Sequence, residues 1–525
     1  MTGPTDAGPD QRATVRSEPA RPMVIIMTLV VSAFVMILNE TILSVALPHL
    51  TGDLGVSATT VQWLTSGFLL TMGVVIPTTG YILNRFTPRQ VFLAAMTLFS
   101  TGTLICALSP GFTLLLAGRI VQATGTAVMV PLLMTSVMRL IPPERRGATM
   151  GTISIVIAVA PAVGPTIGGL ILASLDWRWM FWSVLPLSLA ALLVGFTLFR
   201  LSSETRSTPL DVLSVLLSAI GFGGIVYGFS TLGHGGSAVV PPWVALVVGA
   251  VALAVFVARQ MQLQRAEAAL LDLRAFAHRP FVVAIVLSAL LFMTLLGAGA
   301  ILLPIYLQNV LGQSTATTGL AVLPGGLLLG VMGRPVGRLF DRLGARPLVI
   351  PGAIGLTVSM WLFATLGASA ALWMVIAVHV LLMASLGLMM TPLLTEGLSV
   401  LPEKLYSHGS AILTTLQQVA GAAGTAGFVT VAALGSSSPT GTPDASGLRA
   451  AFMVAGVIGL VAIGVAFLVR RRPGGAAASG HGGLADGTSG ADGTDTTDTT
   501  DGPDVPAGPD VPRDDRERSA PVVGR

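Results

Sequence analysis

Two charged side chains stand inside long apolar runs of this chain, and both could take part in moving protons. Glu40 lies in the run Met23–Leu47, and Arg119 lies in the run Phe112–Leu140. A charge near the middle of a bilayer costs about 2.5–3.5 kcal/mol even on lenient scales, so it needs a partner, water or a proton. A carboxyl in such surroundings can bind and release a proton near neutral pH. We therefore predict a proton-coupling role for Glu40; the alternative is a protonated Glu that only packs polar helices.

Arg119 stays charged at any relevant pH because its guanidinium does not lose its proton. Glu40 and Arg119 each lie about seven residues from the outer end of their run, which is roughly 10 Å along a helix. We expect the two side chains to lie close enough to couple, with Arg119 favouring ionised Glu40 when the cavity faces one way. The alternative is a structural Arg that donates to backbone carbonyls.

The composition is that of a membrane protein. The 525 residues are 53% hydrophobic and 10% charged, with a net charge of +4, whereas about a quarter of a typical soluble chain is charged. The single cysteine, Cys106, excludes an intrachain disulfide. No Walker-type phosphate loop, H-E-x-x-H or paired cysteines occur, so we expect no nucleotide-driven or metal-dependent chemistry, no cofactor and no enzyme activity.

Fourteen apolar runs, each near the ~20 residues that a helix needs to cross a bilayer, follow one another along the chain. Helices are expected because a bilayer core offers the backbone no water partners, and the runs do not alternate as β-barrel strands do. The fold class predicted is therefore an all-α polytopic membrane protein. The runs are Met23–Leu47, Val61–Leu83, Val91–Leu108, Phe112–Leu140, Ala148–Leu175, Trp179–Leu201, Asp211–Leu232, Trp243–Arg259, Pro280–Leu303, Thr317–Val336, Leu348–Gly367, Ala371–Leu394, Ser410–Leu434 and Ala450–Val469.

The placement of the basic residues predicts the topology. With the N-terminus in the cytoplasm, the outer loops hold only Arg178 and Arg449, and nearly all other basic residues flank the inner ends. So uneven a distribution predicts that both termini are cytoplasmic and that the number of helices is even. The ends of the chain are rich in Gly, Pro and Asp, and we expect them to be disordered tails.

Two short charged loops occupy corresponding places in the two halves of the chain, which indicates an internally repeated membrane protein. Helix N-termini favour an acid and C-termini favour a base, so such loops can contact helix ends and hold one gating state. The downstream loop contains Gly337, Asp341, Arg342 and Arg346, and the upstream loop contains Gly80, Asn84, Arg85 and Arg89.

The pattern of these loops, G-x-L-x-D-R-x-G-x-R, resembles the cytoplasmic loop signature of the major facilitator superfamily. The downstream copy matches nearly in full, while the upstream copy has Asn84 for Asp and Thr87 for Gly. The interval from Gly80 to Gly337 exceeds the roughly 200 residues of six helices and their loops by about two helices. We therefore predict a 6 + 2 + 6 arrangement of fourteen helices: a tail over 1–21, a six-helix bundle over 22–203, two linking helices over 204–265, a second bundle over 266–472 and a tail over 473–525.

Four further stretches resemble the fourteen-helix drug:proton antiporters of this superfamily. Leu38–Pro48 resembles the first-helix signature, Arg119–Gly125 the fourth-helix R-x-x-Q-G-x-G motif and Asp176–Trp182 the W-R-W-x-F loop. The fifth-helix motif G-x8-G-x3-G-P-x2-G-G, which marks exporters in the superfamily, is matched with Ala160 in place of one Gly. Leu38–Leu43 and Ser407–Gly421 are also similar to lincomycin-resistance exporters. The residues of the fifth-helix motif here are Gly151, Gly164, Pro165, Gly168 and Gly169.

Gly164 and Gly168 share one helix face because they are four residues apart. Small residues let a neighbouring helix approach closely, and Pro161 and Pro165 can bend the helix. We interpret this face as a close, bendable contact between the two halves that seals one side of a pore. Ordinary membrane packing is the alternative.

Several polar residues could line a central cavity for substrate. The acid of the family's first-helix motif aligns with Asn39, and neighbours on a helix point about 100° apart. Either Glu40 does a related job from another face, or the proton site lies elsewhere. The possible cavity residues are Asn39, Thr41, Ser44, Gln62, Trp63, Gln122, Gln417 and Gln418.

The resemblance implies a proton-coupled antiporter that exports amphiphilic drugs, antibiotics or secondary metabolites through a bacterial cytoplasmic membrane. Its partners are a small-molecule substrate, protons and the lipid bilayer, and no nucleic acid. Uptake symport of a nutrient is the alternative within transport, which the fifth-helix motif disfavours. A membrane sensor that transports nothing would need no titrating group, and a membrane enzyme is disfavoured because no loop is long enough to hold a paired-carboxylate site.

Overall fold

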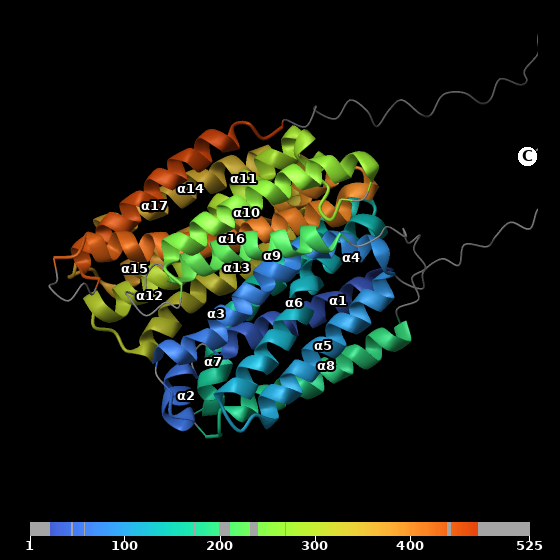
Figure 1. Cartoon of the computed structure of the whole chain (residues 1–525). Helices are drawn as coiled ribbons and strands as arrows, with labels where there is room; N and C mark the ends of the chain where they lie inside the picture. Colours follow the sequence, from blue (N-terminus) through green and yellow to red (C-terminus); the bar gives the residue numbers. More distant parts are fainter. Residues whose placement is uncertain are drawn as a thin grey trace, which may run out of the picture. The chain divides into compact units, whose positions relative to one another are not determined.

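The computed structural model describes residues 22–43, 46–56, 58–172, 174–198, 211–231, 240–267, 269–437 and 443–470. Within these ranges the chain is helical and contains no strand, which confirms the predicted all-α class. Most helices run roughly along one direction in Figure 1.

The described part of the first half contains eight α-helices, with a short 3₁₀ turn between α3 and α4. α5 begins at a complete capping box, in which the Thr87 hydroxyl accepts from Gln90 N–H and Pro88 follows directly. A capping box and a proline at the first helical position both favour a helix start there. The elements are α1 (Pro22–Ile42), α2 (Leu47–Leu54), α3 (Ala58–Val75), η2 (Ile76–Thr78), α4 (Thr79–Arg85), α5 (Pro88–Leu108), α6 (Phe112–Leu140), α7 (Arg146–Leu172) and α8 (Arg178–Leu198).

Two helices follow as a hairpin, α9 (Val212–Thr231) and α10 (Pro242–Leu263). Gly224 and Gly249 lie where these helices cross, and an added Cβ at either would meet the backbone of the other helix. α9 also packs against α3 of the first half and against α16 of the second half (Figure 1). The hairpin therefore contacts both halves.

The second half begins with a long segment that changes its winding. α11 (Arg279–Thr294) continues into the π-helix η6 (Leu295–Leu302), the turn α12 (Leu303–Ile305) and the π-helix η7 (Tyr306–Val310). The run therefore extends beyond its predicted end at Leu303. The remaining helices are α13 (Thr315–Leu343), α14 (Arg346–Thr365), α15 (Leu372–Ser399), α16 (Tyr406–Leu434) and α17 (Ala445–Ala466).

Among the described residues, 12 segments are long and apolar enough to cross a membrane. α7, with 27 residues, and α16, with 29, are not among these segments, although both exceed the ~20 residues of a span. The first predicted run, Met23–Leu47, is also shorter than expected, because α1 ends at Ile42 and the separate short helix α2 begins at Leu47.

The two halves meet mainly where α4, α6, α13 and α15 end, which we call the arginine-rich end. α7 and α13 pack there with almost no side chain between them, since a Cβ at Gly151 would overlap the Gly333 carbonyl and one at Gly337 would overlap the backbone of Gly147. Small residues allow such close approach between helices in lipid. Near this end Thr135 also bonds Ser410 at 3.0 Å, across the halves.

We predict that Gly151→Ala destabilises the protein by about 1–3 kcal/mol, because the added methyl meets backbone that cannot move aside. The matched control is Gly169→Ala on the same helix, where nothing lies within 4 Å of an added Cβ. A thiol-reactive dye reports unfolding in detergent, since the single cysteine, Cys106, is buried. Equal melting midpoints for the two variants would contradict the proposed contact.

Candidate functional site

The Arg119 side chain is the centre of a buried polar cluster in the first half. It is 1% exposed and donates from Nη1 to Gln122 Oε1 at 2.8 Å and to Asn39 Oδ1 at 3.2 Å. Its Nε donates to the Leu64 carbonyl at 3.4 Å, and its guanidinium lies 4.1 Å from the centre of the Phe68 ring. The cation is therefore held by neutral oxygens and an aromatic face.

The helix sequences place these groups together. Arg119 and Gln122 are three residues apart on α6 and therefore share a face. Gln122 in turn donates from Nε2 to Thr103 Oγ1 of α5 at 2.8 Å. α5 and α6 can approach this closely because Gly102 and Gly118 lie between them, and a Cβ at Gly102 would overlap the backbone of Gln122.

Asn39, rather than Glu40, is the α1 residue that bonds Arg119. Asn39 is fully buried, and its Nδ2 has no hydrogen-bond partner among the described residues. Glu40 is partly buried, and its carboxyl and the guanidinium of Arg119 act on each other electrostatically. The site thus holds a fixed cation, one amide nitrogen (Asn39 Nδ2) without a partner among the described residues, and one carboxyl whose charge acts on the cation. Arg119 also donates to the Leu64 backbone carbonyl, a contact that the alternative of a structural Arg predicts.

The fifth-helix residues lie in two different contacts. Gly151 faces α13 of the other half, whereas Gly164 faces Thr41, and Gly168 faces the Ile42 backbone, both on α1 of the same half. The interpretation of the Gly164–Gly168 face as a contact between the two halves is therefore wrong. An added Cβ at Gly169 meets nothing within 4 Å. Pro165 lies within α7, but its side chain is outside the described ones. Thr41 Oγ1 also donates to the Ala160 carbonyl of α7 at 3.4 Å, which adds a hydrogen bond to the contact between α1 and α7.

The downstream loop contacts the first half through Asp341. Both carboxylate oxygens accept backbone N–H groups at the start of α7, from Gly147 and from Ala148, each at 2.9 Å. A carboxylate at a helix N-terminus is favoured by the unpaired N–H groups and by the helix dipole. Arg342 is exposed and Arg346 is partly buried at the start of α14. Asp341 therefore caps a helix of the opposite half.

The upstream loop contacts the second half through Asn84. Asn84 Oδ1 accepts from Ser407 Oγ at 2.6 Å, and its amide nitrogen lies 2.9 Å from His408 Nε2. Gly80 packs directly on His408, since an added Cβ would meet the ring and the Cα. Arg85 ends α4.

The other arginine of the upstream loop turns away from this contact. Arg89 donates to the Phe196 carbonyl at 3.1 Å, and its guanidinium lies over the ring of that residue at 5.3 Å. Because Phe196 belongs to α8, this arginine stays within the first half.

The expected cavity residues do not gather in one place. Trp63 packs its ring 5.8 Å from that of Tyr227 on α9. Gln418 donates to Met72 Sδ at 3.9 Å across the halves, and Gln417 is buried with its Nε2 unpaired among the described residues. Ser44 and the Gln62 side chain lie outside the described residues.

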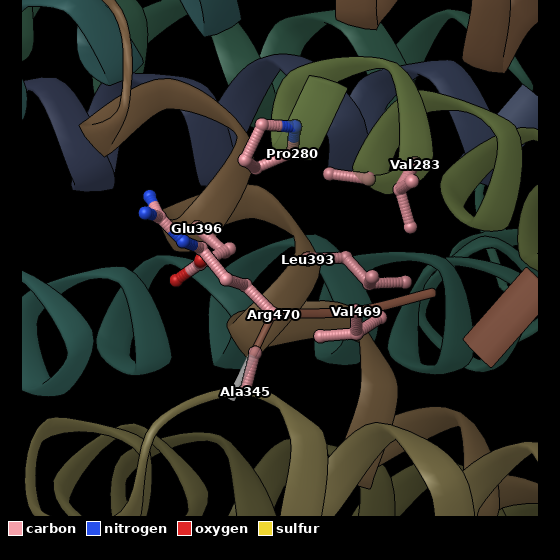
Figure 2. A pocket seen from close by; sticks show the side chains of 8 residues that line it. Pro280, Val283, Ala345, Leu393, Glu396, Val469 and Arg470 are labelled. Carbon is pink, nitrogen blue, oxygen red and sulfur yellow. The ribbon is translucent and has the colours of Figure 1, made fainter. Parts of the chain in front are cut away.

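A small pocket of about 230 Å³ lies between helix ends of the second half, away from Arg119. Figure 2 shows Glu396 and Arg470 on the same side of it, facing an otherwise apolar lining. Part of that volume is open solvent; the enclosed volume is about 10 Å³, which has room for about one water molecule and none for a drug. Its lining residues are Pro280, Val283, Ala284, Ala345, Leu393, Glu396, Val469 and Arg470.

Two ion pairs lie outside the Arg119 cluster, beside the linking hairpin. Arg259 bonds Asp211 at 2.7 Å, which lowers the pKa of that carboxyl from 3.8 to about 2. Because the pKa of Asp211 is lowered, the pair stabilises the fold fully at pH values above 3.8, the ordinary pKa of the carboxyl. This stabilisation is lost as the pH falls toward 2. Burial works against ionisation of Asp272, but the hydrogen bonds from Arg274 outweigh it and lower the pKa of this carboxyl.

Sequence reasoning did not identify His408 or Asp272 as site residues. Both lie in loops between the predicted apolar runs, where a polar residue is ordinary. The available signal was the adjacent pair Ser407–His408 in the stretch that is similar to lincomycin-resistance exporters.

Two halves of apolar helices, joined at one end and with a guanidinium buried inside the first half, define a multi-pass membrane protein with the architecture of a transporter. The chain belongs to the major facilitator superfamily, whose family model matches residues 29–425. The members of this family are transporters rather than enzymes.

Relatives match over most of the chain. It is 40% identical over 469 residues to the lincomycin resistance protein LmrB of Bacillus subtilis, covering 87% of this chain and 97% of the relative. The lincomycin resistance protein LmrB of Listeria monocytogenes is 40% identical over 425 residues, covering 81% and 89%. The solved structure of the proton:xylose symporter XylE has a TM-score of 0.61 and 17% identity, over 86% of this chain and 96% of that one. The last likeness concerns the fold alone.

We predict that Arg119→Ala destabilises the protein by at least about 2 kcal/mol, because it leaves buried oxygens of Asn39 and Gln122 without a donor. Arg449→Ala, at an exposed position, is the matched control. Melting in detergent followed by circular dichroism measures both. An Arg119→Ala variant that melts with the control would show that the cluster contributes nothing to stability.

Proposed function

We propose that this protein is a proton-coupled antiporter that exports amphiphilic drugs or related secondary metabolites across a bacterial cell membrane. The observation that carries the coupling is the Arg119 cluster, in which a buried cation, the unpaired Asn39 amide and the Glu40 carboxyl lie within one apolar half. Charged groups at this depth are expensive, and in transporters they mark ion and proton pathways.

Export is supported by the relatives. Two proteins named for lincomycin resistance match this chain over 97% and 89% of their own length. The fold does not decide the direction of transport, because the symporter XylE shares it. Symport into the cell therefore remains the second candidate, and the direction of flux driven by a pH gradient separates the two.

The mechanism follows from alternating access. The halves are held together at the arginine-rich end by Asp341 of α13, which caps the start of α7, and by the glycine contact between α7 and α13. Cargo and proton would compete as ligands of one two-state device, each favouring a different state. Protonation of Glu40 from outside would favour release of cargo, and deprotonation inside would restore binding. One proton moving inward across 100 mV supplies about 2.3 kcal/mol.

The membrane arrangement proposed is fourteen spans in a 6 + 2 + 6 order, with both termini in the cytoplasm. α7 and α16 join the 12 apolar segments to give this number, and their lengths of 27 and 29 residues suffice for a bilayer. The linking pair is α9 and α10. The arginine-rich end then faces the cytoplasm, as the positive-inside rule expects.

We predict that Glu40→Gln abolishes substrate-dependent proton release from acidified inverted vesicles, because the amide cannot carry a proton between the two states. The control is Glu144→Gln, an exposed carboxyl beside α7, which should behave as the wild type. Dequenching of a pH-sensitive dye across a panel of lipophilic antibiotics measures the effect. Undiminished release by Glu40→Gln would place the coupling site elsewhere.

We predict that the arginine-rich end is cytoplasmic. In a Cys106→Ala background, Lys404→Cys should resist a membrane-impermeant maleimide in whole cells, and Ser437→Cys, at the opposite helix end, should react. Both positions are exposed, so access alone decides the labelling. The reverse pattern would invert the topology.

A further inference from the structure

His408, near the start of α16, joins three parts of the chain that are distant in sequence. Its Nε2 lies 2.9 Å from the Asn84 amide of α4. Its Nδ1 accepts the backbone N–H of Asp272 at 3.3 Å. The side chain is buried, and Gly80 of α4 packs against the ring without a side chain between them. This imidazole therefore bridges the two halves at the arginine-rich end.

The hydrogen bonds leave room for only one proton on the ring. Because Nδ1 accepts from Asp272 N–H, the proton of a neutral imidazole must lie on Nε2. A half-turn of the Asn84 amide lets Oδ1 accept from that Nε2–H while Nδ2 donates to Ser407 Oγ, so that both ring nitrogens and both amide atoms are paired. A second proton on Nδ1 would point at the Asp272 N–H, and the contact would have to open.

The charged groups around the ring do not remove this constraint. Asp272 and Arg274 act on it electrostatically, but they are bonded to each other at 2.6 Å. From α4 the ring is contacted by Gly80 and Asn84, which are both neutral. The Asp272 carboxylate is thus engaged by Arg274, and the hydrogen bond to the ring comes from the Asp272 backbone N–H.

Two further arginines beside α16 make their contacts away from the ring. On α6, Arg139 interacts with Glu403 in the turn before α16. On α7, Arg146 lies over the Tyr406 ring at 5.7 Å and donates to the Met138 carbonyl at 2.7 Å. Among the described residues, no carboxylate is hydrogen-bonded to the imidazole.

The linking hairpin is connected to the same point. Gln260 of α10 accepts the Leu271 N–H at 3.2 Å and donates to Ser214 of α9 at 2.7 Å. Leu271 precedes Asp272, whose N–H the ring accepts. A path of hydrogen bonds, with the peptide bond between Leu271 and Asp272 in its middle, thus runs from the hairpin through His408 to the first half.

We propose that His408 is a pH-sensitive joint of the gate at the arginine-rich end: the neutral ring holds α16 to α4 and to the segment before α11, and a second proton releases it. The proposal rests on the alternating-access function above, which supplies the opening of this end. Since the closed arrangement takes only the neutral ring, acid favours the open one, and closure is complete above the range where histidine titrates, near pH 6.5.

The test measures the distance between the two halves at the arginine-rich end, and it needs neither substrate nor transport. Spin labels at Phe86→Cys and Lys404→Cys lie on exposed positions of the two halves, in a Cys106→Ala background. Distance distributions are recorded at about pH 8 and about pH 5.5, on either side of the ordinary histidine range. The expected wild-type result is one short distance in base and a second, longer distance that gains population in acid.

His408→Gln should lose this response to pH, and His379→Gln should keep it, because His379 is a buried histidine on α15 bonded to Val322 within its own half. His408→Asn, whose side-chain oxygen can still accept the Asp272 N–H, replaces the Gln variant if that variant does not fold. A response that persists without His408, or that disappears only in Glu40→Gln, would overturn the proposal. Failure of drug transport with an intact response would count against the exporter alone.

Discussion

The close approach of α7 and α13 is the constraint on which the arrangement of the two halves depends. At Gly151 and Gly337 backbone meets backbone, and Asp341 covers the N–H groups at the start of α7. In a bilayer, apolar side chains gain little by leaving lipid, so packing and hydrogen bonds hold helices together. A contact made of backbone surface and one carboxylate can separate without leaving an apolar face exposed to water.

In the proposed mechanism, the coupling of cargo to protons depends on the Arg119 cluster. A cation solvated by neutral oxygens keeps its charge when a nearby carboxyl changes state, because none of its hydrogen bonds ends on that carboxyl. Glu40 can therefore gain or lose a proton without the cluster coming apart. Within the cluster, Asn39 Nδ2 has no hydrogen-bond partner among the described residues, and a cargo molecule or a water could satisfy it.

The helical fold could be predicted from the sequence, because long apolar runs in lipid have few alternatives to helices. The break in the helix after Ile42 and the π-helical turns from Leu295 could not be predicted, because hydropathy does not distinguish an α-helix from a π-helix or a broken helix. The side chain that meets Arg119 depends on the rotation of α1, and neighbouring residues differ by about 100°. Nor could the sequence pair Asn84 with His408, since that contact joins two halves far apart along the chain.

The most direct test of the account is purified protein in sealed liposomes that are loaded with a lincosamide and given an acid exterior or interior. We predict that the compound moves against its own gradient, toward the acidic compartment, when the protein is present, and that movement stops when the pH gradient is collapsed. Movement only down the gradient of the compound, unchanged by the pH difference, would contradict proton-driven export.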